Sequence, residues 1–197
     1  MRLFPRIKLT FSEPRKINIP ESFVGRKKRQ YASEKIYRIM TNTLLQSYDK
    51  SENLFDLLKN ASKIHGKSKV IVRDANKNDL SYRSLITKAY VLNELIKKNV
   101  GTEKNIGVLL PNVTAASVLF FSLQLGSKVA TMLNFSSGFK NLMYACDTIR
   151  LKYVYTSRAF VEAAFLQEVI KGMESKGIKV IYLEDLKDII SAKDKAL

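Results

Sequence analysis

The pattern of apolar and polar positions is most pronounced over residues 106–138, the most apolar stretch of the chain. Residues 106–110 form a short continuous apolar run, which is typical of a strand buried on both faces. Pro111 and Asn112 end this run, and a second apolar run over residues 129–133 predicts another strand. The two strands and the segment between them indicate a strand–helix–strand unit, which crosses over right-handed within a parallel sheet.

The segment between these strands predicts a helix over residues 115–125. Thr114 precedes it and is a candidate N-cap, because its side-chain oxygen suits the unpaired amides of a first helical turn. Gly126 follows the last apolar position and is expected to end the helix. Since the helix is apolar nearly all round, we expect it to lie between layers rather than on a surface.

Helical and strand-like patterns alternate on both sides of this unit, which predicts an α/β fold with a parallel sheet covered on both faces. Asn53 and Ser81 are candidate N-caps of two further helices, and Gly66 and Gly101 are expected to lie beyond their ends. The long helix after Ser81 has an apolar stripe at Leu85, Ala89, Leu92 and Ile96. Further helices are predicted from after Gly138 to about residue 150, over about residues 158–171, and from about residue 185. Further strands are predicted over residues 70–72, 153–155 and 180–183.

The first quarter of the chain has a different pattern. It holds three of the four prolines, and Ile7, Leu9 and Phe11 alternate with polar residues, which predicts one edge-type strand and an extended tail. A helix is predicted over about residues 33–47, with Ile36, Ile39, Met40, Thr43 and Leu44 on one face. Residues 1–50 are therefore expected to be a small strand-plus-helix piece, and residues 51–197 a partial, layered parallel-sheet domain.

Positive charge is concentrated in this N-terminal piece. The chain has a net charge of +16, with 34 Lys and Arg against 18 Asp and Glu. Residues 1–50 hold 12 of the Lys and Arg and four of the Asp and Glu, so they carry a net charge of +8. Such a segment is attracted to the phosphates of nucleic acid or of anionic lipid. The run at residues 25–30, GRKKRQ, either contacts phosphates or is a solvated lead-in to the helix, and the absence of interleaved aromatic residues favours the lead-in.

Neither a secretory signal nor a membrane-spanning run is visible in the sequence. Cys146 is the one cysteine, which suits a reducing compartment, and its position at helical spacing among apolar residues predicts a buried, inert thiol. We therefore expect a cytoplasmic protein.

Candidate catalytic residues are few. His65 is the one histidine and lies at a helix end, so a Cys/His metal site with four ligands from this chain is excluded. Gly172 and Gly177 have the glycine spacing of a phosphate loop, but Ile178 stands in place of the lysine and a strand follows, which indicates a helix end and a loop. Glu184, Asp185 and Asp188 are interpreted as an N-cap and as acidic residues favoured by the dipole of the last helix. The sequence therefore assigns no catalytic, cofactor-binding or metal-binding residue.

Several motifs in residues 51–197 resemble the beginning of the AMP-binding, acyl-adenylate-forming synthetases. Residues 80–85, LSYRSL, are similar to the T-Y-x-E-L helix start of that family, and residues 106–112, IGVLLPN, to its V-x-x-x-x-P-N strand and turn. Residues 132–138, 156–160 and 182–186 resemble a bifunctional subfamily, 2-acylglycerophosphoethanolamine acyltransferase/acyl-[acyl-carrier-protein] synthetase. Ala130 departs from that subfamily, which tends to have proline there.

The N-terminal piece is similar to the tail of the acyltransferase domain of the same subfamily, through residues 4–7, FPRI, and 25–29, GRKKR. That domain works through H-x4-D, whereas here His65 is followed five positions later by Val70. In the synthetase half, the resemblance implies that the phosphate loop, an acidic residue for magnesium and a late lysine all follow Leu197. Both catalytic sets are therefore expected to be absent from these 197 residues.

The resemblance implies a fragment of a bifunctional enzyme that activates fatty acids with ATP and magnesium and re-acylates lysophospholipid at the inner membrane. Its partners would be acyl carrier protein and lysophospholipid, and the fragment alone is expected to be inactive. Two alternatives stay open: one half of a split synthetase that acts with a separately encoded chain, or a basic module that binds an anionic membrane or nucleic acid through residues 1–50. No specific nucleic acid is expected.

Overall fold

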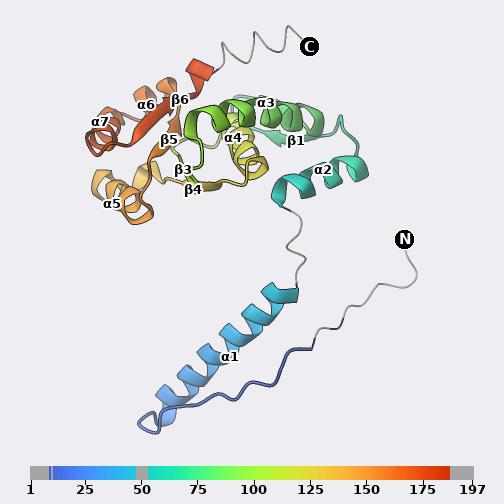
Figure 1. Cartoon of the computed structure of the whole chain (residues 1–197), viewed down its shortest axis with the longest axis vertical. Helices are drawn as coiled ribbons and strands as arrows, with labels where there is room; N and C mark the ends of the chain where they lie inside the picture. The colour runs from blue at the N-terminus through green and yellow to red at the C-terminus, as the bar shows by residue number, and fades with distance from the viewer. Residues whose placement is uncertain (1–8, 10, 48–52, 187–197) are drawn as a thin grey trace. The chain divides into compact units, whose positions relative to one another are not determined.

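The computed structural model describes residues 9, 11–47 and 53–186 (Figure 1). The chain divides into two units, Met1–Ser51 and Glu52–Leu197.

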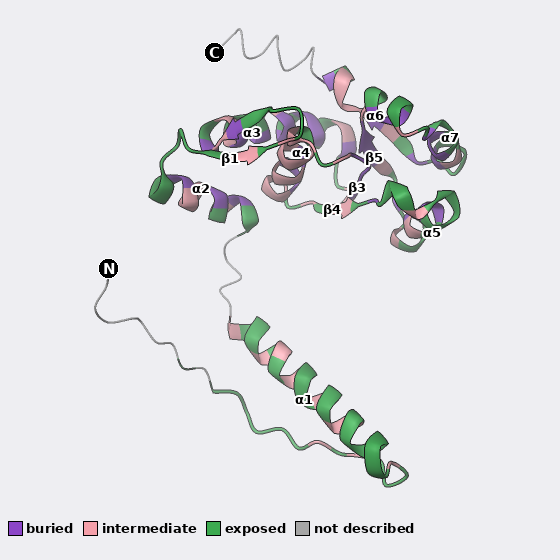
Figure 2. Cartoon of the chain, turned by 180° about the vertical axis from the view of Figure 1, so that it is seen from behind, coloured by how far each residue is buried: buried purple, intermediate pink, exposed green. Residues whose placement is uncertain are grey.

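The first unit contains one long helix, α1 (Gly25–Ser47), none of whose residues is buried (Figure 2). The helix begins at Gly25 rather than near residue 33, so the basic run forms its first turns and is not a lead-in to it. Residues 9 and 11–20 form no strand, and the side chains of Leu9 and Phe11 are exposed. The predicted edge strand is therefore wrong at these positions, since a strand needs a paired neighbour; Ile7 lies outside the described residues. No helix in the described part of the chain is long and apolar enough to cross a membrane.

The second unit contains the predicted parallel sheet. Its strands lie in the order β4-β3-β5-β6, and each pair of neighbours is parallel. In β3, Ile106 and Gly107 pair with Ala130 and Thr131 of β4, and Val108 pairs with both Met132 and Tyr155. The strands are β3 (Asn105–Val108), β4 (Val129–Met132), β5 (Tyr153–Thr156) and β6 (Lys179–Tyr182).

Helices cover the sheet on both faces (Figure 1). The long helix α3 (Tyr82–Val100) packs with α4 (Thr114–Leu125) over the face that presents Ile106, Val108 and Tyr155. The opposite face presents Leu109 and Val154 to three further helices. These are α5 (Phe139–Ile149), α6 (Arg158–Ala163) and α7 (Gln167–Ser175). The apolar stripe that the sequence predicts along α3 is buried, and the α/β fold class is confirmed.

One predicted strand belongs to a different sheet. β1 (Val70–Arg73) pairs antiparallel with β2 (Asp79–Ser81), a strand that the sequence pattern did not reveal. The turn between them is too short for the helical crossover that a parallel pair needs. This hairpin packs with α2 (Leu54–His65) and α3 around Phe55, Leu80 and Leu85.

The predicted helix over residues 158–171 is interrupted. α6 ends at Ala163 and α7 begins at Gln167, with Phe165 between them at a φ of 52°. Leu166 follows Phe165 and is buried, while Phe165 itself is exposed. Leu166 belongs to the core cluster on this face of the sheet, so the break lies where the chain turns inward.

The predicted caps of α2 and α3 are confirmed. The Asn53 side chain accepts a hydrogen bond from the Asp56 amide at 2.9 Å, and the Ser81 hydroxyl accepts one from the Ser84 amide at 3.2 Å. Each bond satisfies an amide that has no partner within the first helical turn.

Candidate functional site

The carboxyl edge of the parallel sheet is the place where this topology is expected to bind a ligand. After β3 the chain passes to α4 on one face, and after the neighbouring β5 it passes to α6 on the other. In open α/β sheets, ligands bind at such a switch point. Here the two strand ends are tied together, because the buried Thr156 hydroxyl donates to the Leu109 carbonyl at 2.8 Å.

The start of α4 is held by a carboxylate from a distant turn. Asp74 follows β1, and its Oδ2 lies 3.2 Å from both the amide nitrogen and the Oγ1 of Thr114. Thr114 is the first helical residue, and Val113 stands at the N-cap position without a side-chain bond. The prediction that Thr114 caps the helix is therefore wrong: Thr114 donates, and Asp74 supplies the acceptor.

Hydrogen bonds from its own turn also hold Asp74. Its carboxylate accepts from the Asn78 side chain at 3.1 Å and from the backbone amides of Asn76 and Asn78, each at 3.0 Å. These bonds to Asn78, with those from Thr114, lower the pKa of Asp74 to about 2. A carboxylate with so low a pKa is a weak base, so its contact with the Thr114 hydroxyl stabilises the helix rather than activating a nucleophile.

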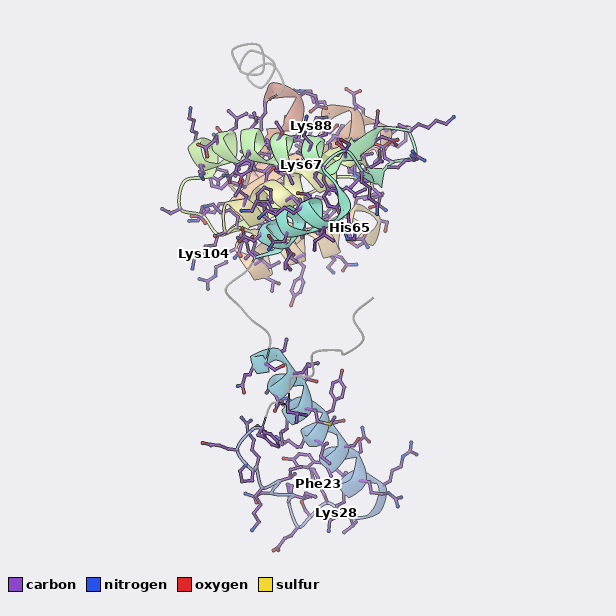
Figure 3. The ribbon with its side chains drawn as sticks, turned by 90° about the vertical axis from the view of Figure 1, so that its right-hand side faces the viewer. Phe23, Lys28, His65, Lys67, Lys88 and Lys104 are labelled. Atoms are coloured by element: carbon purple, nitrogen blue, oxygen red, sulfur yellow. The ribbon has the colours of Figure 1, made fainter. Side chains whose placement is uncertain are left out.

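A cavity of about 550 Å³ lies beside this cap. Its walls come from the β1–β2 hairpin, from α3 and from the start of α4, and Leu183 after β6 also lines it. The lining is mostly apolar, and the one basic side chain among the lining residues is the exposed Lys88 of α3, labelled in Figure 3. The lining carboxylate of Asp79 is paired with Arg73 at 2.6 and 2.7 Å. This cavity suits an apolar group better than a reacting polar one.

A second polar cluster lies where β5 and β6 end. Glu184 Oε1 accepts hydrogen bonds from the Ser157 hydroxyl at 2.9 Å and from the Arg158 amide at 2.8 Å. The Arg158 guanidinium donates to both carboxylate oxygens of Asp185 and lies 4.3 Å from the centre of the Tyr182 ring. The cluster therefore joins the end of β6 to the start of α6.

This cluster corrects the prediction for the acidic residues. The last helix already begins at Leu183, so Glu184 does not cap it, but caps α6 instead. Burial raises the pKa of Glu184, but hydrogen bonds from its own backbone, from Ser157 and from the first amides of α6 outweigh this and leave that pKa below its usual value. Asp188 lies outside the described residues.

His65 and Cys146, the one histidine and the one cysteine, lie apart from both polar clusters. His65, labelled in Figure 3, is the exposed last residue of α2. Its ring stacks on Tyr82 with the ring centres 6.5 Å apart. Cys146 is buried, and burial raises the pKa of its thiol. Within residues 9, 11–47 and 53–186, no three His, Cys, Asp or Glu side chains are placed to hold a metal ion.

The glycine pair also lies as interpreted. Gly172 is inside α7, and Gly177 follows its end with a φ of 77° before β6 begins. Positive φ is the conformation that suits glycine beyond a helix end. The pair therefore forms a helix end and a loop, not a phosphate loop.

An apolar face remains open on the other side of α4. Phe120 and Phe121 are only half-buried, and the Met132 side chain at the edge of the sheet is 57% exposed. Together with Val72 and Val113 they line a groove of about 440 Å³. The expectation that α4 lies between layers is thus met where α3 and the cluster around Phe55 cover it, while the groove leaves part of its surface open.

Comparison with solved structures shows what this fold is similar to, whereas no family model matches the sequence. VinN aligns with a TM-score of 0.60 at 18% identity, over 74% of this chain and 37% of its own. The N-terminal domain of FACL13 from Mycobacterium tuberculosis, solved with an inhibitor bound, aligns with a TM-score of 0.59 at 13% identity, over 70% and 35%. A protein described as a putative long-chain-fatty-acid CoA ligase from Rhodopseudomonas palustris CGA009 aligns with a TM-score of 0.56 at 13% identity, over 68% of this chain and 33% of its own.

These similarities confirm the resemblance at the level of the fold. The mixed α/β unit with its four-stranded parallel sheet matches an N-terminal subdomain of the AMP-binding fold. The chain spans about a third of the length of these solved chains.

Proposed function

We propose that this chain supplies the first subdomain of an acyl-adenylate-forming ligase and that it contributes to activation of a carboxylic acid by ATP only together with the rest of that fold. The observation that carries the proposal is the fold match, which covers most of this chain but only about a third of each ligase-like chain. The motifs at residues 80–85 and 106–112 point to the same family.

The described polar residues at the sheet edge stabilise the fold, which agrees with a subdomain that does not carry the catalytic groups itself. The carboxylates at the sheet edge, Asp74 and Glu184, cap helices, and the Asp79 carboxylate is held by Arg73. The open face at Phe120, Phe121 and Met132 has the apolar character of a subdomain contact. Covering it with the remaining part of the fold removes this apolar surface from water.

For the finer activity, we propose a fatty acid as the substrate and acyl carrier protein as the acceptor, with lysophospholipid as the final acceptor in the intact enzyme. The resemblance of residues 132–138, 156–160 and 182–186 to the bifunctional subfamily supports this choice. Comparing acyl carrier protein with coenzyme A as the acceptor in the reconstituted enzyme distinguishes this proposal from a CoA ligase.

ATP–pyrophosphate exchange with fatty acids tests the proposal. The 197-residue chain alone should give no exchange above background, and co-expression with a polypeptide that supplies the remaining two thirds of the fold should give exchange. Activity of the chain alone would overturn the need for the remainder. Absence of exchange from a stable, co-purified assembly would overturn the ligase function itself.

A matched pair of variants tests the contact surface. Met132→Asp introduces a charge on the open face, whereas Tyr144→Asp introduces one at a 73% exposed position of α5. Both side chains are exposed, so both variants should fold. We expect Met132→Asp to prevent co-purification and exchange, and Tyr144→Asp to leave both unchanged.

A further inference from the structure

Helix α1 exposes an apolar face that no described residue of its own unit buries. Ile36, Met40 and Leu44 follow one another at four-residue spacing and so lie on one side of the helix. Their side chains are 47%, 66% and 55% exposed. Met40 and Leu44 line a shallow groove of about 820 Å³ along the helix, with Ser12 at its other wall.

The start of the same helix is unusually basic. Residues 26–29 are Arg, Lys, Lys and Arg, and the first turn has no acidic residue. Lys27 packs over the Phe23 ring at 4.5 Å, and Figure 3 shows Phe23 and Lys28 at this end of the helix. The positive end of the helix dipole lies here, so these cations oppose it. An anionic surface at this end would relieve the repulsion.

The helix also lacks the usual source of helical stability. Helices in proteins are stabilised mostly by burial of an apolar face, and no residue of α1 is buried (Figure 2). A surface that is both apolar and anionic satisfies the apolar face and the basic start together.

We propose that α1 binds the surface of an anionic lipid bilayer, with Ile36, Met40 and Leu44 in the boundary between headgroups and acyl chains and the cations of residues 26–29 at lipid phosphates. Nucleic acid offers the phosphates but no apolar layer for these three side chains. The inference rests on the first unit alone and does not depend on the proposed ligase function.

Co-sedimentation of the full chain with vesicles tests the charge. We expect binding to vesicles that contain phosphatidylglycerol, none to phosphatidylcholine alone, and a steep loss with salt. Replacing Arg26, Lys27, Lys28 and Arg29 by Gln should weaken binding by at least about 100-fold. A control with Lys63, Lys67, Lys69 and Lys140 replaced by Gln has the same net charge and should bind like wild type. Equal losses in both variants would overturn the site.

Fluorescence tests the apolar face, since the chain has no tryptophan. Met40→Trp should shift to shorter wavelength on adding phosphatidylglycerol vesicles, and Tyr144→Trp on α5 should not shift. A Met40→Trp spectrum that vesicles leave unchanged would overturn the proposal. So would tighter binding to duplex DNA than to the vesicles at the same salt concentration.

Discussion

Asp74 and Thr114 are 40 residues apart in the sequence, yet the Asp74 carboxylate accepts hydrogen bonds from both the amide and the hydroxyl of Thr114. Through this pair the turn of the β1–β2 hairpin provides the cap of α4. The position of the hairpin and the start of the helix at the sheet edge are therefore coupled.

Removing this cap should destabilise the second unit. Asp74→Ala removes the acceptor of the Thr114 amide and hydroxyl at the start of α4, so we expect the melting temperature to fall by about 2 to 8 °C. Thr114→Val removes only the hydroxyl bond and should lower it less. Thermal unfolding followed by circular dichroism measures both, and Asp147→Ala, at an exposed ion pair with Lys176, is the control. Equal effects of Asp74→Ala and Asp147→Ala would contradict the capping role.

The two helix-capping carboxylates predict how stability changes in acid. The pKa of Asp74 is about 2 and that of Glu184 also lies below its usual value, so both favour the folded state when ionised. Their contribution is present above the unfolded pKa values near 4, and it is lost as the pH falls through the folded ones.

The variant Asp74→Asn/Glu184→Gln should therefore be less stable than wild type at neutral pH, with a difference that shrinks between about pH 5 and pH 2. Urea unfolding at several pH values measures this difference. A difference that stays constant with pH would show that the two charges do not stabilise the fold.

Gly126 and Asn93 form a close contact between the end of α4 and α3. A Cβ at Gly126 would lie 2.5 Å from Asn93 Oδ1, a buried atom without a hydrogen-bond partner in the described part of the chain. Gly126→Ala should lower the free energy of unfolding by about 1 to 3 kcal/mol. In an Asn93→Ala background the same change should cost much less, as a double-mutant cycle of chemical denaturation would show. Additive effects would mean that the contact is relieved elsewhere.

Cys146 should react with thiol reagents only when the second unit opens. Its side chain is 1% exposed, and burial raises the pKa of the thiol. We expect modification by a disulfide reagent to be slower in the native chain than in urea by about two orders of magnitude. A native rate close to the unfolded rate would identify an accessible, reactive thiol instead.

The sequence pattern was sufficient for much of the α/β unit because its information is local. The apolar run at residues 106–110 and the stripe along α3 each report which side of an element faces the core. The Asn53 and Ser81 caps were predictable for the same reason, since each bonds an amide three residues away. None of these features requires knowledge of a distant residue.

The candidate site could not be predicted in the same way. The capping roles of Asp74 and Glu184 join residues 40 and 26 positions apart, and neither partner is visible in a local pattern. The Asp74–Asn78 turn is the one local feature that indicates a carboxylate held in place. The β2 strand was missed because three residues are too few to show a period.

The sequence alone thus determined most of the helices and strands of the second unit, its parallel sheet and the concentration of charge in the first quarter, because periodicity and composition are properties of neighbouring residues. Only the tertiary structure decided which carboxylate caps which helix, that β1 pairs with β2 in a separate hairpin, and that α1 carries an unburied apolar face. The physical reason is that hydrogen bonds across the fold and burial depend on what the folded chain brings together, and not on the order in which the residues are joined.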